Sequence, residues 1–119
     1  MRVAAWAVRE QARILGRTPV GCAVLSSDGR VWSGCNVEHR FRSHDIHAEV
    51  NAIGSMVAGG GRELIAVFVA AERERFTPCG ACLDWVFEFG GPECLVIWEG
   101  SDRSARTLRA EELMPYYPA

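Results

Sequence analysis

Residues 76–85 of the chain read FTPCGACLDW and contain two of its five cysteines, Cys79 and Cys82. A proline precedes the pair, and a run with helical character follows it. A C-x-x-C pair can form a redox couple, supply half of a zinc site, or consist of two unreactive thiols at the start of a helix. What the pair does therefore depends on which other residues the chain brings to it.

A histidine and a glutamate upstream favour a zinc site. His47 and Glu49, in the sequence H-A-E, open a predicted helix, and a predicted strand separates them from Cys79 and Cys82. Two thiols and an imidazole at helix N-termini are suited to zinc, because a helix N-terminus favours the thiolate form of cysteine. Three protein ligands leave one tetrahedral position for water, which is typical of catalytic zinc. Glu49 lies beside this site and is placed to carry protons.

The remaining sequence predicts one α/β domain over residues 1–119. The periodicity of the apolar residues and the positions of Gly and Pro predict helices over 3–15, 47–58 and 79–89 and a helical turn over 110–115. They also predict strands over 20–27, 30–37, 64–71, 93–100 and 105–109. Asp28-Gly29 between the first two strands is a hairpin signal. A hairpin followed by alternating strands and helices predicts a three-layer α/β/α sandwich on a five-stranded mixed sheet.

Composition excludes several classes of protein. The chain has 119 residues, a formal charge of −2 and no apolar run of membrane-spanning length. It also lacks a basic cluster of the kind that a dedicated nucleic-acid binder uses. An odd number of cysteines without a secretory signal predicts reduced thiols and a cytoplasmic location. Cys22, Cys35 and Cys94 fall in predicted strands and are expected to be buried.

Four segments together resemble the small zinc-dependent cytidine deaminases, including blasticidin S deaminase. The segments are PVGCAVLSSDGRVWSGCNVE (19–38), the H-A-E sequence, TPCGACLDW (77–85) and EELMP (111–115). The combination of H-x-E with P-C-x-x-C is a general signature of zinc-dependent nucleobase deaminases. The resemblance covers residues 18–117 and implies the same α/β/α fold.

The resemblance implies a hydrolytic mechanism with one Zn²⁺. His47, Cys79 and Cys82 would bind the ion, and zinc-bound hydroxide would attack C4 of the cytosine ring. Glu49 would move the water proton to the ring nitrogen and later protonate the departing ammonia. One neutral imidazole and two thiolates already neutralise the zinc charge. This agrees with Val50 standing where many relatives with three cysteine ligands have an arginine.

The resemblance also implies a substrate and an assembly. The backbone of Ala48 and Cys79 would hold the exocyclic amine, and Asn36 and Glu38 would bind the ribose hydroxyls. The substrate would be cytidine, deoxycytidine or a modified cytosine nucleoside such as blasticidin S, with water as the second reactant. The enzyme would be a homotetramer acting in pyrimidine salvage, antibiotic resistance or biosynthesis, with no nucleic-acid or membrane partner.

Two departures from the family pattern indicate a remodelled base pocket. Thr18 stands where the family usually has a phenylalanine that packs on the base, and residues 39–41 read HRF where the family usually has a different continuation. Arg40 and Arg42 could contact an acidic substituent of the substrate or could be solvated charges. Tyr116 and Tyr117 could line a pocket, either of the same subunit or of a neighbour.

Three alternative functions remain open at this point. Cys79 and Cys82 could form a thiol-disulfide oxidoreductase, and His44 could close a purely structural zinc site. A deaminase of another aminated heterocycle or of a nucleic-acid base would share the H-A-E and P-C-x-x-C sequences. Asn36 and Glu38 could likewise be ordinary turn and edge residues.

Overall fold

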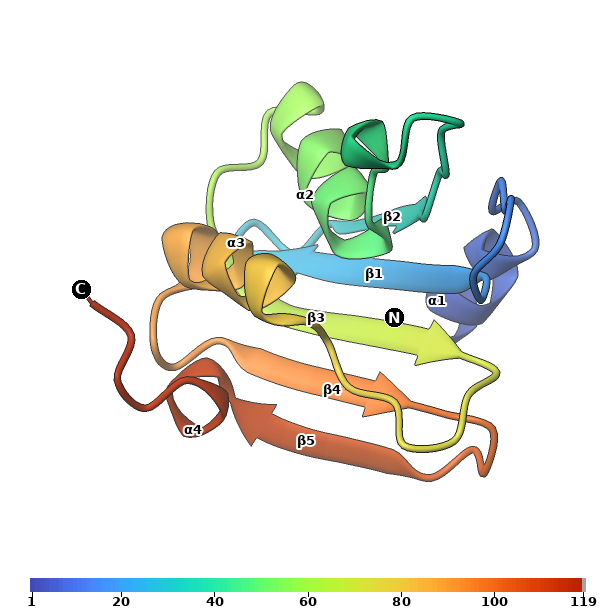
Figure 1. Ribbon diagram of the computed structural model, residues 1–119. Coiled ribbons are helices and arrows are strands. Elements are labelled where there is room, and N and C mark those ends of the chain that lie inside the picture. The colour runs from blue at the N-terminus through green and yellow to red at the C-terminus, as the bar shows by residue number, and fades with distance from the viewer. Residues whose placement is uncertain (119) are drawn as a thin grey trace.

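The chain forms one five-stranded mixed sheet in a computed structural model that describes residues 1–118 (Figure 1). The strands are β1 (Val20–Ser26), β2 (Val31–Cys35), β3 (Leu64–Ala71), β4 (Leu95–Glu99) and β5 (Ala105–Arg109), in the order β2-β1-β3-β4-β5. Strands β3 and β4 are parallel, and all other neighbouring pairs are antiparallel. The predicted five-stranded mixed sheet is confirmed.

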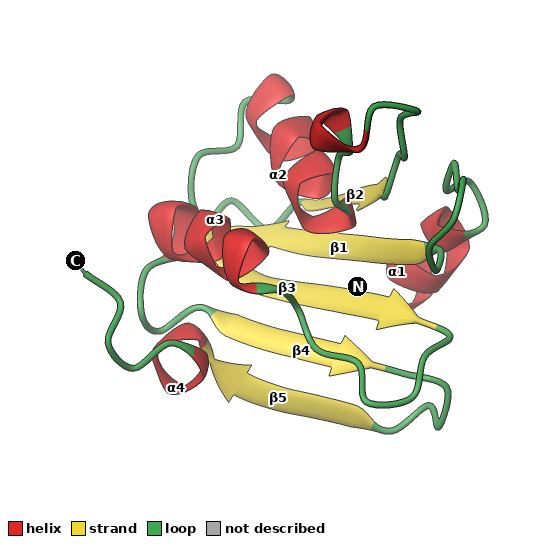
Figure 2. Cartoon of the chain, in the orientation of Figure 1, coloured by secondary structure: helices red, strands yellow, loops and turns green. Residues whose placement is uncertain are grey.

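Helices cover both faces of the sheet (Figure 2). They are α1 (Arg2–Arg9), α2 (Ala48–Ala58), α3 (Gly80–Gly90) and α4 (Ala110–Leu113), with a 3₁₀ turn η1 (Arg42–His44). Alternate residues of a strand point to opposite faces. Cys22 and Val67 join the cluster that contains α2 and α3, whereas Ala23 and Phe68 pack with Ala5 of α1. The sheet therefore lies between α1 and the α2–α3 pair, which confirms the predicted three layers.

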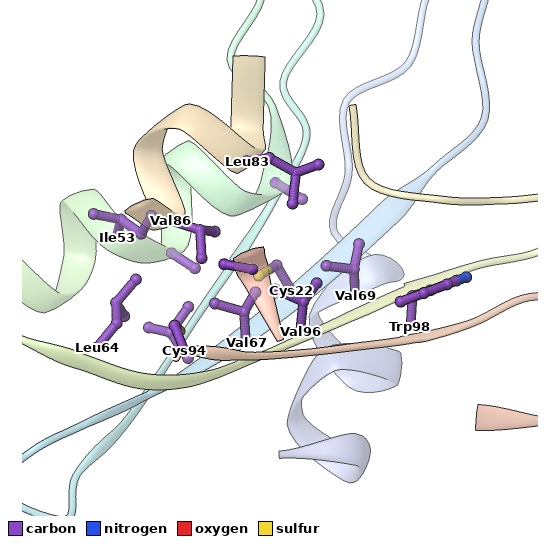
Figure 3. Packing of buried hydrophobic residues seen from close by; sticks show 14 of the residues in the cluster. Cys22, Ile53, Leu64, Val67, Val69, Leu83, Val86, Cys94, Val96 and Trp98 are labelled. Carbon is purple, nitrogen blue, oxygen red and sulfur yellow. The ribbon is translucent and has the colours of Figure 1, made fainter. Parts of the chain in front are cut away.

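The main hydrophobic core fills the space between the sheet and helices α2 and α3 (Figure 3). Ile53 of α2 and Val86 of α3 pack on Val67 and Val96 of the two central parallel strands. Cys22 and Cys94 belong to this core, and Cys35 is also buried, as predicted for small apolar side chains. This packing fixes α2 and α3 on one face of the sheet, and both helices carry predicted site residues at their first turns.

The predicted helix over 3–15 is wrong in its second half. Helix α1 ends at Arg9, and the chain then turns so that Arg13 pairs with the segment after β2. The N–H of Arg13 donates to the Asn36 carbonyl at 3.1 Å, and the N–H of Glu38 donates to the Arg13 carbonyl at 2.8 Å. Tertiary backbone pairing thus overrides an apolar period that continues to Leu15, which is exposed.

The other elements begin and end within about two residues of their predicted bounds. The hairpin at Asp28-Gly29 is present, and Gly29 has a φ of 85° that favours glycine. No helix in the described residues is both long enough and apolar enough to cross a membrane.

Substitution of Gly34 tests the close packing of β2 against α2. A Cβ at Gly34 would lie 2.4 Å from the Ala52 nitrogen, whereas a Cβ at Gly54 of α2 would meet nothing within 4 Å. We expect Gly34→Ala to lower the free energy of unfolding by about 1–3 kcal/mol, measured by urea denaturation. The control Gly54→Ala should raise it by about 0.5–1 kcal/mol, because alanine is the better helix former. A Gly34→Ala protein of unchanged stability would contradict this packing.

Candidate active site

The first turns of α2 and α3 present the predicted metal ligands. His47 is the N-cap residue of α2 and Cys79 is the N-cap residue of α3, each with extended backbone angles. Neither side chain caps its own helix, so both are free to point elsewhere. Cys82 lies in the first turn of α3 and is buried. Two helix N-termini therefore face one set of ligands, which favours negative charge on the sulfur atoms.

The three side chains converge on a volume that suits a metal ion. Their ligand atoms lie within 4.8 Å of one another. The Nδ1 atom of His47 lies 3.2 Å from the Cys82 sulfur and 3.5 Å from the Cys79 sulfur. Tetrahedral zinc with ordinary bond lengths separates a nitrogen and a sulfur ligand by about 3.5 Å. One ring nitrogen carries at most one proton, so two sulfur atoms this close to it fit a shared cation.

The donor set and its electrostatics fit zinc. Two thiolates and one imidazole form a soft set with tetrahedral preference, which selects zinc over magnesium or calcium. Burial and, second, the negative charge of Glu49 raise the pKa of the Cys82 thiol. A dication beside the sulfur reverses this effect, because metal coordination deprotonates a thiol. A bound cation therefore stabilises the thiolate form of Cys82, which burial and Glu49 disfavour.

Glu49 is a buried carboxylic acid next to these ligands. It is the second residue of α2, and its side chain is 5% exposed. Burial raises the pKa of the Glu49 carboxyl above its ordinary value. A raised pKa makes the carboxylate a better proton acceptor than an exposed one and moves the pKa towards neutral pH, so that one group can act as base and then as acid. Glu49 is thus placed and tuned for proton transfer.

A cavity of about 150 Å³ opens beside the metal ligands and Glu49. Engineered cavities of about 150 Å³ take up benzene, so the cavity has room for one six-membered ring. Six of the seven residues predicted for the site line it: Asn36, Glu38, His47, Ala48, Glu49 and Cys79. The seventh, Cys82, is buried in the first turn of α3 and is not among the lining residues. Thr18 also lines the cavity, as the comparison with the family pattern suggests.

Asn36 ties the cavity wall to the start of β1. Its side-chain oxygen accepts from the Val20 N–H at 2.8 Å, and its amide nitrogen donates to the Thr18 carbonyl at 2.9 Å. Asn36 is 8% exposed. An asparagine amide has two N–H donors and an oxygen with two lone pairs, so each end retains one site for a ligand.

Glu38 is a buried carboxylate whose two oxygens have different partners. Its Oε1 accepts from the N–H groups of Leu15 at 2.7 Å and Gly16 at 2.9 Å. Its Oε2 forms an ion pair with Arg42 at 3.1 Å but accepts no hydrogen bond from the described residues. Burial acts to raise the pKa of Glu38, but the two N–H groups and Arg42 outweigh it and hold that pKa below its ordinary value. Glu38 is therefore a fixed negative charge at the cavity.

The loop between β2 and α2 places the remaining histidines and arginines away from the metal ligands. His44 lies in η1 and does not belong to the group of metal-binding atoms among the described residues. Arg42 is an ion-pair partner of both Glu38 and Asp45, and its side chain is 42% exposed. Arg40 lies over the Phe41 ring at 4.8 Å and does not line the cavity. The geometry of the described residues therefore gives no support for His44 as a fourth protein ligand of the metal.

The two tyrosines near the C-terminus do not line this cavity. Tyr116 is 96% exposed. Tyr117 stacks on Phe87 at a centroid distance of 4.1 Å, and its hydroxyl donates to Asp84 of α3. The tyrosines therefore contribute to the surface and to the attachment of the C-terminal segment within one chain.

Sequence reasoning missed two arginines of the site. Arg17 and Arg73 both line the cavity, one from the segment before β1 and one from the segment after β3. No motif marks either residue. The two segments come together because Val20 pairs with Ala71. Their proximity can therefore be inferred only once the strand register is known.

The fold is similar to that of solved cytidine deaminases. The structure of cytidine deaminase from Burkholderia pseudomallei superposes with a TM-score of 0.91 at 33% identity, covering 98% of this chain and 94% of that one. Cytidine deaminase of Sporosarcina psychrophila is 40% identical over 68% of this chain, which spans 61% of the relative's length. Blasticidin-S deaminase of Bacillus cereus is 28% identical over 81% of this chain and 74% of its own.

The chain also matches a known protein family over a range that includes the residues of the site. Residues 1–98 match the family described as the cytidine and deoxycytidylate deaminase zinc-binding region. The matched range includes His47, Cys79, Cys82 and Glu49. The chain therefore belongs to the cytidine and deoxycytidylate deaminase family and carries its zinc-binding region.

Proposed function

We propose that this protein is a zinc-dependent hydrolase that deaminates a cytosine nucleoside or a modified cytosine nucleoside. The observation that carries the proposal is the meeting of Cys79, Cys82 and His47 Nδ1 beside the buried Glu49, at a cavity with room for one ring. In the reaction, water adds at C4 of the ring, the C–NH₂ bond breaks, and the products are a C4 carbonyl and ammonia. Atoms and protons balance without a further reactant.

His47, Cys79 and Cys82 would hold the ion, which supplies a Lewis acid that lowers the pKa of a bound water towards neutrality. Glu49 would accept a proton from that water and deliver it to the ring nitrogen beside C4. Glu49 would then carry the second proton to the departing amine. A single buried carboxyl can serve both steps because it is protonated and deprotonated in turn.

The cavity wall would orient the substrate. The backbone of Ala48 and Cys79 would contact the exocyclic amine, next to Glu49. Glu38 Oε2, whose partner among the described residues is the Arg42 ion pair, would accept a hydrogen bond from a sugar hydroxyl, with Asn36 beside it. In this arrangement the base would lie at the metal end and the sugar at the Asn36–Glu38 end, which supports a nucleoside rather than a free base as the substrate.

The relatives support the proposed substrate range. A cytidine deaminase aligns with 68% of this chain and a blasticidin-S deaminase with 81%, so the range that we propose includes both kinds of compound. We further propose that residues 1–119 form one deaminase domain, that four copies assemble into a homotetramer, and that the enzyme acts in the cytoplasm in pyrimidine salvage. Light scattering that shows a monomer would contradict the assembly.

Replacement of Glu49 tests the proton-transfer step. We expect Glu49→Gln to lower kcat for cytidine by about 10²–10⁴-fold, because the proton carrier is lost, while zinc content stays unchanged. Ultraviolet absorbance of the cytosine-to-uracil conversion gives the rate. Exposed Glu63 is a matched control, and Glu63→Gln should retain full activity. Normal turnover by Glu49→Gln would eliminate the proposed mechanism.

Replacement of Cys79 distinguishes the zinc-site hypothesis from the redox-pair hypothesis. The wild-type protein should contain about one zinc per chain by elemental analysis, and Cys79→Ser should lose most of it. Cys94→Ala, which removes a core thiol away from the site, should keep the zinc. Metal-free wild-type protein that reduces insulin disulfides would instead support the thiol-disulfide oxidoreductase alternative.

Replacement of Glu38 tests the sugar contact. We expect Glu38→Gln to lower kcat/KM for cytidine by about 10–100-fold, as expected for a lost hydrogen bond to a charged group. The loss should be much smaller for 2′,3′-dideoxycytidine, which lacks the hydroxyls that Glu38 would bind. Equal losses on both substrates would show that Glu38 only maintains the fold near Leu15 and Gly16, and thermal unfolding would reveal the same defect.

A further inference from the structure

The loop that joins β2 to α2 in Figure 1 carries an arginine that contacts two carboxylates at once. Arg42 Nη2 lies 3.1 Å from Glu38 Oε2 and 2.8 Å from Asp45 Oδ2, and Arg42 Nε donates to the same Asp45 oxygen at 2.9 Å. Glu38 and Asp45 line the cavity, whereas Arg42 does not. The guanidinium group therefore contacts two groups of the cavity wall without being part of that wall.

Asp45 fixes the orientation of Arg42. Asp45 Oδ1 accepts from the His39 N–H at 2.7 Å, and Asp45 Oδ2 is the oxygen that contacts two nitrogens of Arg42. The N–H of Asp45 also donates to the Arg42 carbonyl at 3.1 Å. A planar guanidinium that contacts a carboxylate through two nitrogens has a defined orientation, which a point charge lacks. Side-chain and backbone contacts within the loop thus determine where Arg42 meets Glu38.

Arg42 contacts the Glu38 oxygen that the backbone does not reach. The N–H groups of Leu15, Gly16 and Arg17 lie 2.7, 2.9 and 3.4 Å from Glu38 Oε1, whereas the partner of Oε2 among the described residues is Arg42. Each carboxylate oxygen has two lone pairs, so Oε2 can contact Arg42 and still accept from a ligand. Rotation of the carboxylate would break the contacts of both oxygens.

The same loop connects the sugar end of the cavity to the metal end. Val37 and Ile46 exchange two backbone hydrogen bonds, of 2.8 and 2.9 Å, which close the loop at its base. Glu38 directly follows Val37, and the predicted metal ligand His47 directly follows Ile46. The contact of Arg42 with Glu38 adds a side-chain link inside this closed loop. The position of the Glu38 carboxylate relative to the metal ligands therefore depends on Arg42.

We propose that Arg42 is a positioning residue, which holds the Glu38 carboxylate in the orientation in which Oε2 accepts a hydrogen bond from the sugar and does not itself contact the substrate. The inference rests on the proposed function, in which Glu38 binds the sugar. Arg42 acts on the binding of substrates that carry sugar hydroxyls and leaves the reaction at the ring unchanged. It does not bind an acidic substituent of the substrate, because its guanidinium group already pairs with Glu38 and Asp45.

Steady-state kinetics with cytidine and 2′,3′-dideoxycytidine test this role. We expect Arg42→Gln to raise KM for cytidine by about tenfold and to change kcat by less than about twofold, because a binding contact is weakened and the chemistry is retained. KM for 2′,3′-dideoxycytidine should stay unchanged, because that compound lacks the hydroxyls that Glu38 would bind. The zinc content should also stay unchanged, since Arg42 is not a metal ligand.

Two single variants separate positioning from a general effect on the loop. Arg42→Lys should recover part of the loss in KM, because lysine keeps the positive charge near Glu38 but cannot contact Asp45 through two nitrogens. It also replaces Arg42→Gln in the assay if that variant does not fold. Arg40→Gln is the matched control and should keep the wild-type KM, because Arg40 is an exposed arginine of the same loop that lies over the Phe41 ring.

A double variant shows whether Arg42 acts through Glu38. If it does, Arg42→Gln should change the KM of the Glu38→Gln protein for cytidine by less than about twofold, because the group that Arg42 positions is already altered. An arginine that contacts the substrate directly would instead produce losses that multiply in the double variant.

Three results would overturn the inference: an unchanged KM for cytidine in Arg42→Gln, an equal rise in KM for both nucleosides, or losses that multiply in the double variant. If wild-type protein deaminates cytidine and any of these results is found, this inference fails and the proposed function stands. If zinc-loaded wild-type protein deaminates neither nucleoside, the proposed function fails, and this inference fails with it.

Discussion

The site depends on the approach of the N-termini of α2 and α3. Two cysteine sulfurs lie 3.2 and 3.5 Å from one imidazole nitrogen, so neither helix can shift along its axis without separating the ligands. The core between these helices and the sheet holds that geometry, through Ile53 and Val86 against Val67 and Val96. Because the ligands sit at helix N-termini, the backbone also contributes partial positive charge to the thiolates. The fold therefore supplies both the spacing and part of the electrostatics.

Two buried carboxyl groups share the cavity, and their surroundings separate their roles. Burial raises the pKa of Glu49, which can then exchange protons. Glu38 is equally buried, but the N–H groups of Leu15 and Gly16 and the charge of Arg42 hold its pKa low. One group is suited to move protons and the other to remain charged and accept hydrogen bonds. The loop before β1 supplies the N–H groups that outweigh burial at Glu38, whereas burial outweighs the hydrogen bonds at Glu49.

Much of the fold and of the site follows from short-range sequence signals. The hairpin at Asp28-Gly29, the apolar run of β3 and the helix starts at His47 and Cys79 are all local features, and the structure has each of them. The predicted extension of the first helix to residue 15 failed because backbone pairing of Arg13 with the segment after β2 is a long-range contact. No periodicity in the sequence can reveal such a contact.

Local patterns do not reveal every residue that lines the cavity. Arg17 and Arg73 both line it because Val20 pairs with Ala71, and in the sequence their isolated positions resemble ordinary surface charges. Arg42 was also open to that interpretation, yet it pairs with Glu38 and Asp45. Motifs thus predict the candidate metal ligands and Glu49, whereas the strand register determines which other residues line the cavity.

X-ray absorption spectroscopy at the zinc edge of the purified protein tests the central claim most directly. We predict two sulfur ligands at about 2.3 Å and two nitrogen or oxygen ligands at about 2.0–2.1 Å, with scattering from a single imidazole. That pattern corresponds to Cys79, Cys82, His47 and one water. A second imidazole or a third sulfur would indicate a closed structural site and would contradict the account.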